Sequence, residues 1–87
     1  MLDLQEVDLS EAELCEANFS QVDLLAARLT GANLEDVNLA EANLQRADLS
    51  STDLSGVNWN GATYNRSTMW PAGFEPEKYG LVLVSEA

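Results

Sequence analysis

The chemically reactive side chains of this chain are almost all carboxylates. It contains 15 Asp and Glu residues, no histidine and one cysteine, Cys15. A general base that works near neutral pH is most often a histidine, and enzymes that use two carboxylates hold them in a cleft. The acidic residues here alternate with apolar residues along the chain, which favours solvated side chains. We therefore expect no catalytic residue and no enzyme activity.

Metal and thiol chemistry find equally little support. A single cysteine without histidine excludes a Cys/His zinc site and a disulfide within the chain. No segment has the aspartate spacing of a calcium-binding loop or the glycines of a phosphate-binding loop. The neighbouring Glu13 and Glu16 should raise the pKa of the Cys15 thiol and make it a poor nucleophile. The sequence predicts neither a metal nor a cofactor.

The net charge narrows the choice of partner. A formal charge of −11 on 87 residues argues against direct binding to nucleic acid or to an anionic membrane, and favours a basic partner protein. The charge is uneven, because residues 1–53 hold twelve acidic and two basic residues while residues 54–87 hold three and two. The longest apolar run, Leu81–Val84, is too short to cross a bilayer. No secretory signal is visible, so we expect a cytoplasmic protein.

A repeat of five residues runs through most of the chain and determines its fold. The central residue of each unit is apolar, and nearly all of these residues are leucine. Two positions earlier lies a small or β-branched residue, and the position between is usually Asp or Asn. The series continues to Met69. The central residues that we predict to form the core are Leu4, Leu9, Leu14, Phe19, Leu24, Leu29, Leu34, Leu39, Leu44, Leu49, Leu54, Trp59 and Tyr64.

A period of five fits neither standard element. On a helix, five residues advance about 140° beyond a full turn, so the leucines would scatter around its surface. On a flat strand, an odd period sends successive leucines to opposite faces. The pattern works if the chain turns a corner once per repeat. Each unit then forms one side of a coil, and its apolar side chains point inward.

These tandem units, of the form A/V-D/N-L-x-x over about residues 2–66, resemble the pentapeptide-repeat family, cyanobacterial members included. The resemblance implies an all-β solenoid, a right-handed quadrilateral β-helix with four units per coil and a little over three coils. We expect residues 1–65 to form this β-helix. Residues 66–87, where Pro71 and Pro76 interrupt the register, should form a C-terminal cap. The alternative is a docking tail in which Leu81–Val84 adds as a strand to a partner.

Four units per coil place residues twenty apart in one column, and this singles out several outward positions. Arg28 would lie between Asp8 and Asp48, either to relieve local charge or to contact a partner. Leu25 occupies an outward position that is usually polar, so it is a candidate contact, although single exposed leucines are common. A third column, in which stacked amide side chains would form a ladder, consists of Asn18, Asn38 and Asn58.

The first coil would carry a dense acidic surface without a basic residue. This surface is a candidate contact for a basic partner, and charge can also keep an open β-edge from pairing with another molecule. A homodimer through an end coil is a second option, because it would cover apolar side chains of the first coil. The acidic positions are Asp3, Glu6, Glu11, Glu13 and Glu16.

Two functions of different kinds follow. The first is a non-enzymatic scaffold or protein–protein interaction module, whose partner the sequence does not name. The second is implied by the family resemblance, because some pentapeptide-repeat proteins resemble B-DNA in shape and charge and bind DNA gyrase. The acidic surface fits a DNA mimic in sign. A solenoid about 15 Å tall matches only about half a helical turn of DNA, so we favour the scaffold.

Overall fold

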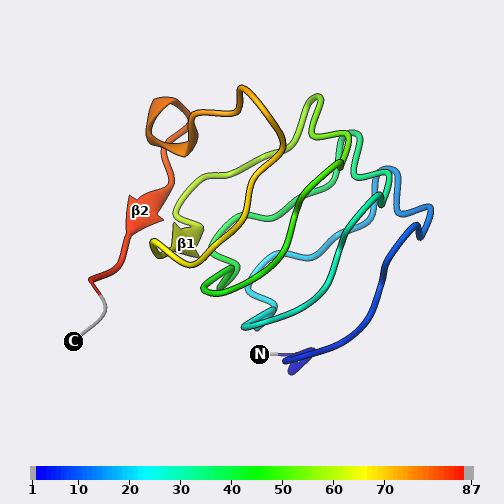
Figure 1. The fold of residues 1–87 in the computed structure, drawn as a ribbon, viewed down its shortest axis with the longest axis horizontal. Coiled ribbons are helices and arrows are strands. Elements are labelled where there is room, and N and C mark those ends of the chain that lie inside the picture. The colour runs from blue at the N-terminus through cyan, green and yellow to red at the C-terminus, as the bar shows by residue number, and fades with distance from the viewer. Residues whose placement is uncertain (1, 86–87) are drawn as a thin grey trace.

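The computed structural model of the protein describes residues 2–85 and shows a chain wound into stacked coils (Figure 1). Residues twenty apart pair through parallel bridges. On one side of the coil, Asp3 pairs with Asp23, Asp23 with Asn43, and Asn43 with Thr63. Because the repeat is five residues long, each coil is divided into four sides.

Backbone hydrogen bonds join each coil to the next. The N–H of Leu4 donates to the carbonyl of Asp23 at 2.8 Å, and the N–H of Asp23 donates back to the carbonyl of Leu2 at 2.9 Å. One residue of each unit thus bridges two residues of the preceding coil, which is the hydrogen-bond pattern of a parallel ladder. The bonds satisfy the backbone groups that run past the apolar interior.

Each corner is a tight turn with a left-handed residue. At the first corner the Val7 N–H donates to the Leu4 carbonyl at 3.1 Å, and Glu6 has a φ of 60°. A positive φ at the third residue is typical of a type II turn, where glycine is the least strained residue. The polar residue of the unit supports the turn, as expected: the Asp3 carboxylate accepts the Gln5 N–H at 3.0 Å, and the same bond recurs in later units.

The central residues point into the coil, and their burial depends on how many coils cover them. Those covered on both sides, together with Trp59, are at most 3% exposed: Leu24, Leu29, Leu34, Leu39, Leu44, Leu49 and Trp59. The other central residues lie toward the two ends of the stack and pack half-buried against this cluster: Leu4, Leu9, Leu14, Phe19, Leu54 and Tyr64.

After the last regular unit the chain gains one residue and the register shifts. The sequence predicts Met69 in the inward column of Leu49, but Met69 pairs with Asp48 and is 54% exposed. The prediction is wrong because the segment before Met69 contains an additional residue. Asn65 and Thr68 are buried there, and the Thr68 hydroxyl accepts the Asn65 N–H at 3.1 Å.

The rest of the described chain crosses the end of the last coil and returns to its first side. The strand β1, Thr63–Tyr64, pairs in parallel with the strand β2, Val82–Leu83. Between them lies a short 3-10 helix, η1, at Pro76–Lys78. Figure 1 shows these elements at the end of the stack that is remote from the first coil.

Aromatic side chains pack together at this end of the stack. Trp70 meets Trp59 edge-on with ring centroids 5.6 Å apart, and meets Tyr64 edge-on at 5.7 Å. Phe74 stacks on Tyr79 with a centroid distance of 4.9 Å and an angle of 9°. Edge-on and offset ring pairs stabilise a core beyond the area that they bury.

The amide ladder expected in one outer column does not form. Asn18, Asn38 and Asn58 do stack through parallel bridges. Each side-chain oxygen, however, accepts an N–H of its own turn, two residues further on. Within residues 2–85 no hydrogen bond joins these three side chains to one another. An amide does bond across coils in a different column, where Asn43 Nδ2 donates to Asp23 Oδ1 at 3.2 Å.

The burial of the central leucines predicts a graded effect of truncation. Leu34→Ala should lower the free energy of unfolding by about 2–5 kcal/mol, because Leu34 is 1% exposed and its neighbours cannot fill the cavity. Leu14→Ala, in the same column of the first coil, should cost less than half as much, because Leu14 is half-buried. Urea unfolding of both variants measures the two free energies of unfolding. Equal losses would contradict the stacking of Leu34 between Leu14 and Leu54 in one column.

The left-handed corners predict opposite effects at two adjacent alanines. Ala26 has a φ of 59°, so Ala26→Gly should leave the free energy of unfolding unchanged or raise it by up to about 1 kcal/mol. Ala27 is 1% exposed and does not have a positive φ, so Ala27→Gly should lower it by about 1–2 kcal/mol. Thermal unfolding checks the order of the two variants against the unmodified protein.

Candidate functional site

The acidic residues of the first coil lie at rigid, divergent positions. Glu6, Glu11 and Glu16 occupy three successive corners, each with a φ between 60° and 64° and an exposed side chain. Their N–H groups are fixed by bonds of 2.9 Å to carbonyls of the next coil. Because corners of one coil point in different directions, these carboxylates do not converge on a common point.

The other two acidic candidates lie on the sides of the coil. Asp3 accepts an N–H of its own turn, and Glu13 accepts a hydrogen bond of 3.3 Å from Asn33 Nδ2 in the next coil. Both side chains are exposed. Between residues 2 and 85, no group of three or more Asp, Glu or Cys side chains is arranged to hold a metal ion. The geometry offers a surface of fixed negative charge, and it does not assemble an acid–base pair in a cleft.

Arg28 lies where the sequence places it, between two carboxylates of one column. It bridges in parallel with both Asp8 and Asp48. Within the described residues no ion pair joins Arg28 to either carboxylate. The pKa values of Asp8 and Asp48 are lowered mainly because each accepts hydrogen bonds from the hydroxyl and the N–H of a serine two residues on, Ser10 or Ser50. The charge of Arg28 contributes less to both shifts.

Arg28 also lines a shallow surface depression of about 600 Å³. Glu11 is the one acidic candidate of the first coil that shares this depression, which brings Glu11 and Arg28 together. Most of the residues that line the depression are polar, and Thr30 and Gly31 are among them. It holds no buried titratable group, so we assign it no chemistry of its own.

Leu25 lies at an outward position, as the sequence predicts, but its side chain is half-buried and not fully exposed. Its N–H donates to Asp23 Oδ1 at 3.1 Å, and its carbonyl accepts the Glu6 N–H at 2.9 Å. Leu25 is therefore next to the first acidic corner and belongs to the same turn-and-ladder pattern as its polar counterparts.

The exposed Cys15 lies close to several acidic side chains. Partial desolvation, followed by the negative charges of Glu13 and Glu35, raises the pKa of its thiol, and Glu16 adds a smaller effect. The direction is the one that the sequence predicts, while the contribution of Glu35 comes from stacking of the next coil. The thiol is thus weakly ionised at neutral pH.

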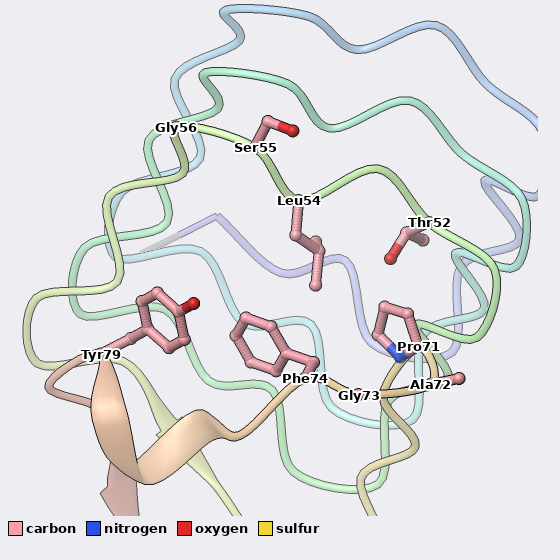
Figure 2. Close-up of a pocket in the computed structure, with 9 residues that line it drawn as sticks. All are labelled: Thr52, Leu54, Ser55, Gly56, Pro71, Ala72, Gly73, Phe74 and Tyr79. Atoms are coloured by element: carbon pink, nitrogen blue, oxygen red, sulfur yellow. The ribbon is translucent and has the colours of Figure 1, made fainter.

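One concave feature escapes the sequence analysis. A depression of about 380 Å³ lies between the last coil and the segment that crosses its end, and Figure 2 shows the residues that line it. The side chain of Leu54 points from one wall toward Pro71 and Phe74 on the other, and Tyr79 lies at the far end. The sequence does contain one indication of this depression. The column of Leu14, Leu34 and Leu54 has no further apolar residue to cover Leu54.

Parallel coils with four sides and an inward apolar column on each side define a β-helical solenoid. The family profile described as the pentapeptide repeat region matches residues 2–70. The chain belongs to the pentapeptide repeat family. No curated protein matches the chain significantly in sequence.

Two solved structures of cyanobacterial proteins are similar. The pentapeptide repeat protein Rfr23 of Cyanothece 51142 is 35% identical with a TM-score of 0.77, covering 78% of this chain and 46% of its own. The pentapeptide repeat protein alr5209 of Nostoc PCC 7120 is 30% identical with a TM-score of 0.59, covering 94% of this chain and 76% of its own. This chain thus spans under half of Rfr23. Both neighbours imply the right-handed quadrilateral β-helix expected from the sequence.

Membrane insertion through a helix has no structural basis in the described residues. None of the helical structure between residues 2 and 85 has the length and apolar character needed to cross a membrane.

The serine bonds predict how one carboxylate titrates. Ser50→Ala should raise the pKa of Asp48 toward its ordinary value, because the hydroxyl bond of 2.5 Å is the largest cause of its lowered pKa. Asp53, which accepts from Ser55 in the same way, should be unaffected. A lowered pKa stabilises the fold above the unfolded-state pKa, and this contribution is lost as the pH falls through the folded-state pKa.

Carboxyl-carbon NMR titration of the two aspartates provides the measurement. The variant should also lose less stability on acidification than the unmodified protein does. An unchanged Asp48 titration would show that Arg28 or solvent, rather than Ser50, holds the carboxylate in its ionised form.

Proposed function

We propose that this protein is a non-enzymatic scaffold that binds another protein through its acidic first coil. Membership of the pentapeptide repeat family supports an interaction role, since such proteins are generally structural or interaction modules. The observation that carries the proposal is the set of exposed carboxylates fixed at the left-handed corners of the first coil, at Glu6, Glu11 and Glu16. Because the backbone at these corners is fixed, the carboxylates meet a complementary surface without any ordering of the backbone.

The chemistry of the partner follows from the charge. We infer a protein with a basic surface, because the first coil has no basic residue and the net charge is −11. The same charge makes direct contact with nucleic acid or with an anionic membrane unfavourable. It also disfavours a homodimer through the first coil, since two acidic coils would face each other. We place the protein in the cytoplasm, where one unpaired cysteine stays reduced.

The extent of the scaffold is part of the proposal. We infer a little over three coils over residues 1–65, supported by the column that runs from Asp3 through Asp23 and Asn43 to Thr63. Residues 66–87 serve as a cap, of which residues 86–87 lie outside the described part. Support for a cap over a docking tail comes from the aromatic contacts of Trp70 with the last coil and from the pairing of β2 with β1.

The DNA-mimic hypothesis has no separate observation in its favour. A mimic needs negative potential along several coils, whereas the formal charge falls from −6 over residues 2–21 to −3 over residues 22–41 and −1 over residues 42–61. The family resemblance fits both hypotheses equally, so the scaffold is preferred.

Capture from a cyanobacterial lysate on the immobilised protein, with elution by a salt gradient, tests the proposed surface. The triple variant Glu6→Gln, Glu11→Gln, Glu16→Gln should bind the captured partner about tenfold more weakly, because three ion pairs at a rim are lost. The partner should also elute at lower salt. Its identity then decides between hypotheses, since recovery of DNA gyrase would favour the mimic.

A control variant removes the same charge from other exposed positions. It should bind the partner as the unmodified protein does, and equal weakening in both variants would show that only net charge matters. Leu25→Glu tests the apolar alternative, because loss of binding there would move the contact from the corners to Leu25. The control substitutions are Glu35→Gln, Glu41→Gln and Glu77→Gln.

A further inference from the structure

Within the described residues, the last coil gains a further strand on two of its four sides and is left open on the other two, residues 52–56 and residues 57–61. On one side, the N–H of Leu49 donates to the Met69 carbonyl at 2.7 Å, and on another, the N–H of Val82 donates to the Ala62 carbonyl at 2.8 Å. These bonds add one further strand to each of the two sides. The described chain supplies no such strand to either open side, and of the two only the side formed by residues 52–56 lines a depression.

Within residues 52–56, the backbone groups that would pair with a further strand have no partners among the described residues. Among the described residues, neither the N–H of Leu54 nor the N–H of Gly56 donates a hydrogen bond, and the carbonyl of Thr52 accepts none. One coil earlier, the equivalent groups of Leu34 and Ala32 are both bonded to Asp53, at 3.0 and 3.3 Å. The spacing of donor and acceptor on the open side is therefore that of a parallel ladder that lacks its next residue.

These unpaired groups border the depression in Figure 2. Its floor is apolar, formed by the half-buried Leu54, Phe74 and Pro71. Tyr79 closes one end, 53% exposed and stacked on Phe74. An open strand edge beside an apolar groove is the arrangement by which proteins accept an extended peptide as an added strand.

We propose that this slot binds an extended segment of a partner protein, which adds to residues 52–56 as a parallel strand. One residue of the segment donates its N–H to the Thr52 carbonyl and accepts the Leu54 N–H through its own carbonyl. The carbonyl two residues further on accepts the Gly56 N–H, as the Ser55 carbonyl accepts the Asp36 N–H at 2.8 Å one coil earlier.

The columns define which side chains the segment carries. The position above Leu54 continues the column of Leu14 and Leu34, so it takes an apolar side chain such as leucine. The position above Asp53 takes a cationic side chain, because Asp53 is exposed and Asp36 lies beside Gly56 at the adjoining corner. In the described residues neither carboxylate is part of an ion pair. The position above Thr52 takes a small residue, which lets the backbone approach closely.

This inference extends the proposed function by a second contact that does not involve the first coil. A suitable probe is the peptide acetyl-Thr-Ala-Lys-Leu-Ser-Lys-amide, titrated into the ¹⁵N-labelled protein. Binding should shift the amide signals of Leu54 and Gly56 downfield and slow their hydrogen exchange. The amides of Leu24 and Leu29, which are buried in the coil before, should not move.

Two modified peptides separate strand addition from simple attraction. Methylation of the backbone N–H of the first lysine removes the donor that reaches the Thr52 carbonyl. This change should weaken binding about tenfold or more. Methylation of the leucine N–H, which points away from the slot, should change affinity less than about twofold. Equal affinities for the two methylated peptides would overturn the parallel strand, and so would the absence of any shift at Leu54.

Protein variants test the choice of occupant. Asp53→Asn keeps the acceptor for Ser55 and removes the charge, so it should weaken the lysine peptide several-fold and leave a peptide with serine in place of the first lysine unchanged. Shifts of the Leu54 amide that grow with protein concentration, without peptide, would show that a second copy occupies the slot and would overturn the proposal. The triple glutamine variant of the first coil should bind the peptide normally, so failure of one proposal is distinguishable from failure of the other.

Discussion

Everything in this structure depends on the left-handed corner that closes each unit. A residue with φ near 60° lets the chain turn after five residues, and only that turn brings residues twenty apart into register. Register in turn aligns the parallel hydrogen bonds and stacks like side chains into dry columns. Most corners hold residues other than glycine, each strained by a moderate amount. The ladder bonds and the Asp or Asn bond at most turns offset this strain, so neither the corner nor the column is stable without the other.

The sequence predicts the regular part of the fold well, because a single constraint is repeated. The spacing of Leu24, Leu29 and Leu34 is enough to place all three inside a coil. Met69 was misplaced because one added residue between the repeat and the aromatic segment leaves no mark in a pattern of period five. The amide ladder predicted for the Asn column is absent for a different reason: the side-chain oxygens of Asn18, Asn38 and Asn58 each accept an N–H of their own turn.

The candidate surfaces differ in how far the sequence could reveal them. Corner carboxylates such as Glu11 follow directly from the repeat, because the last of the five residues in each unit lies at a corner and points outward. The groove beside Leu54 depends on where residues 71–79 pass over the last coil, and non-repeating segments carry no such rule. The effect of Glu35 on Cys15 is likewise invisible in the linear sequence, because the two residues are neighbours only after stacking.

The division of each coil into four equal sides makes the angle between distant surfaces a matter of arithmetic. Removing twenty residues from the middle of the stack would shorten the molecule and leave every later side facing the same way. Removing or adding five would instead rotate all that follows by one side. Duplication or loss of a single unit would therefore redirect the groove at Leu54 relative to the first coil while preserving the local structure of both. In such a protein, orientation between two contacts can vary in quarter turns without any change in the contacts themselves.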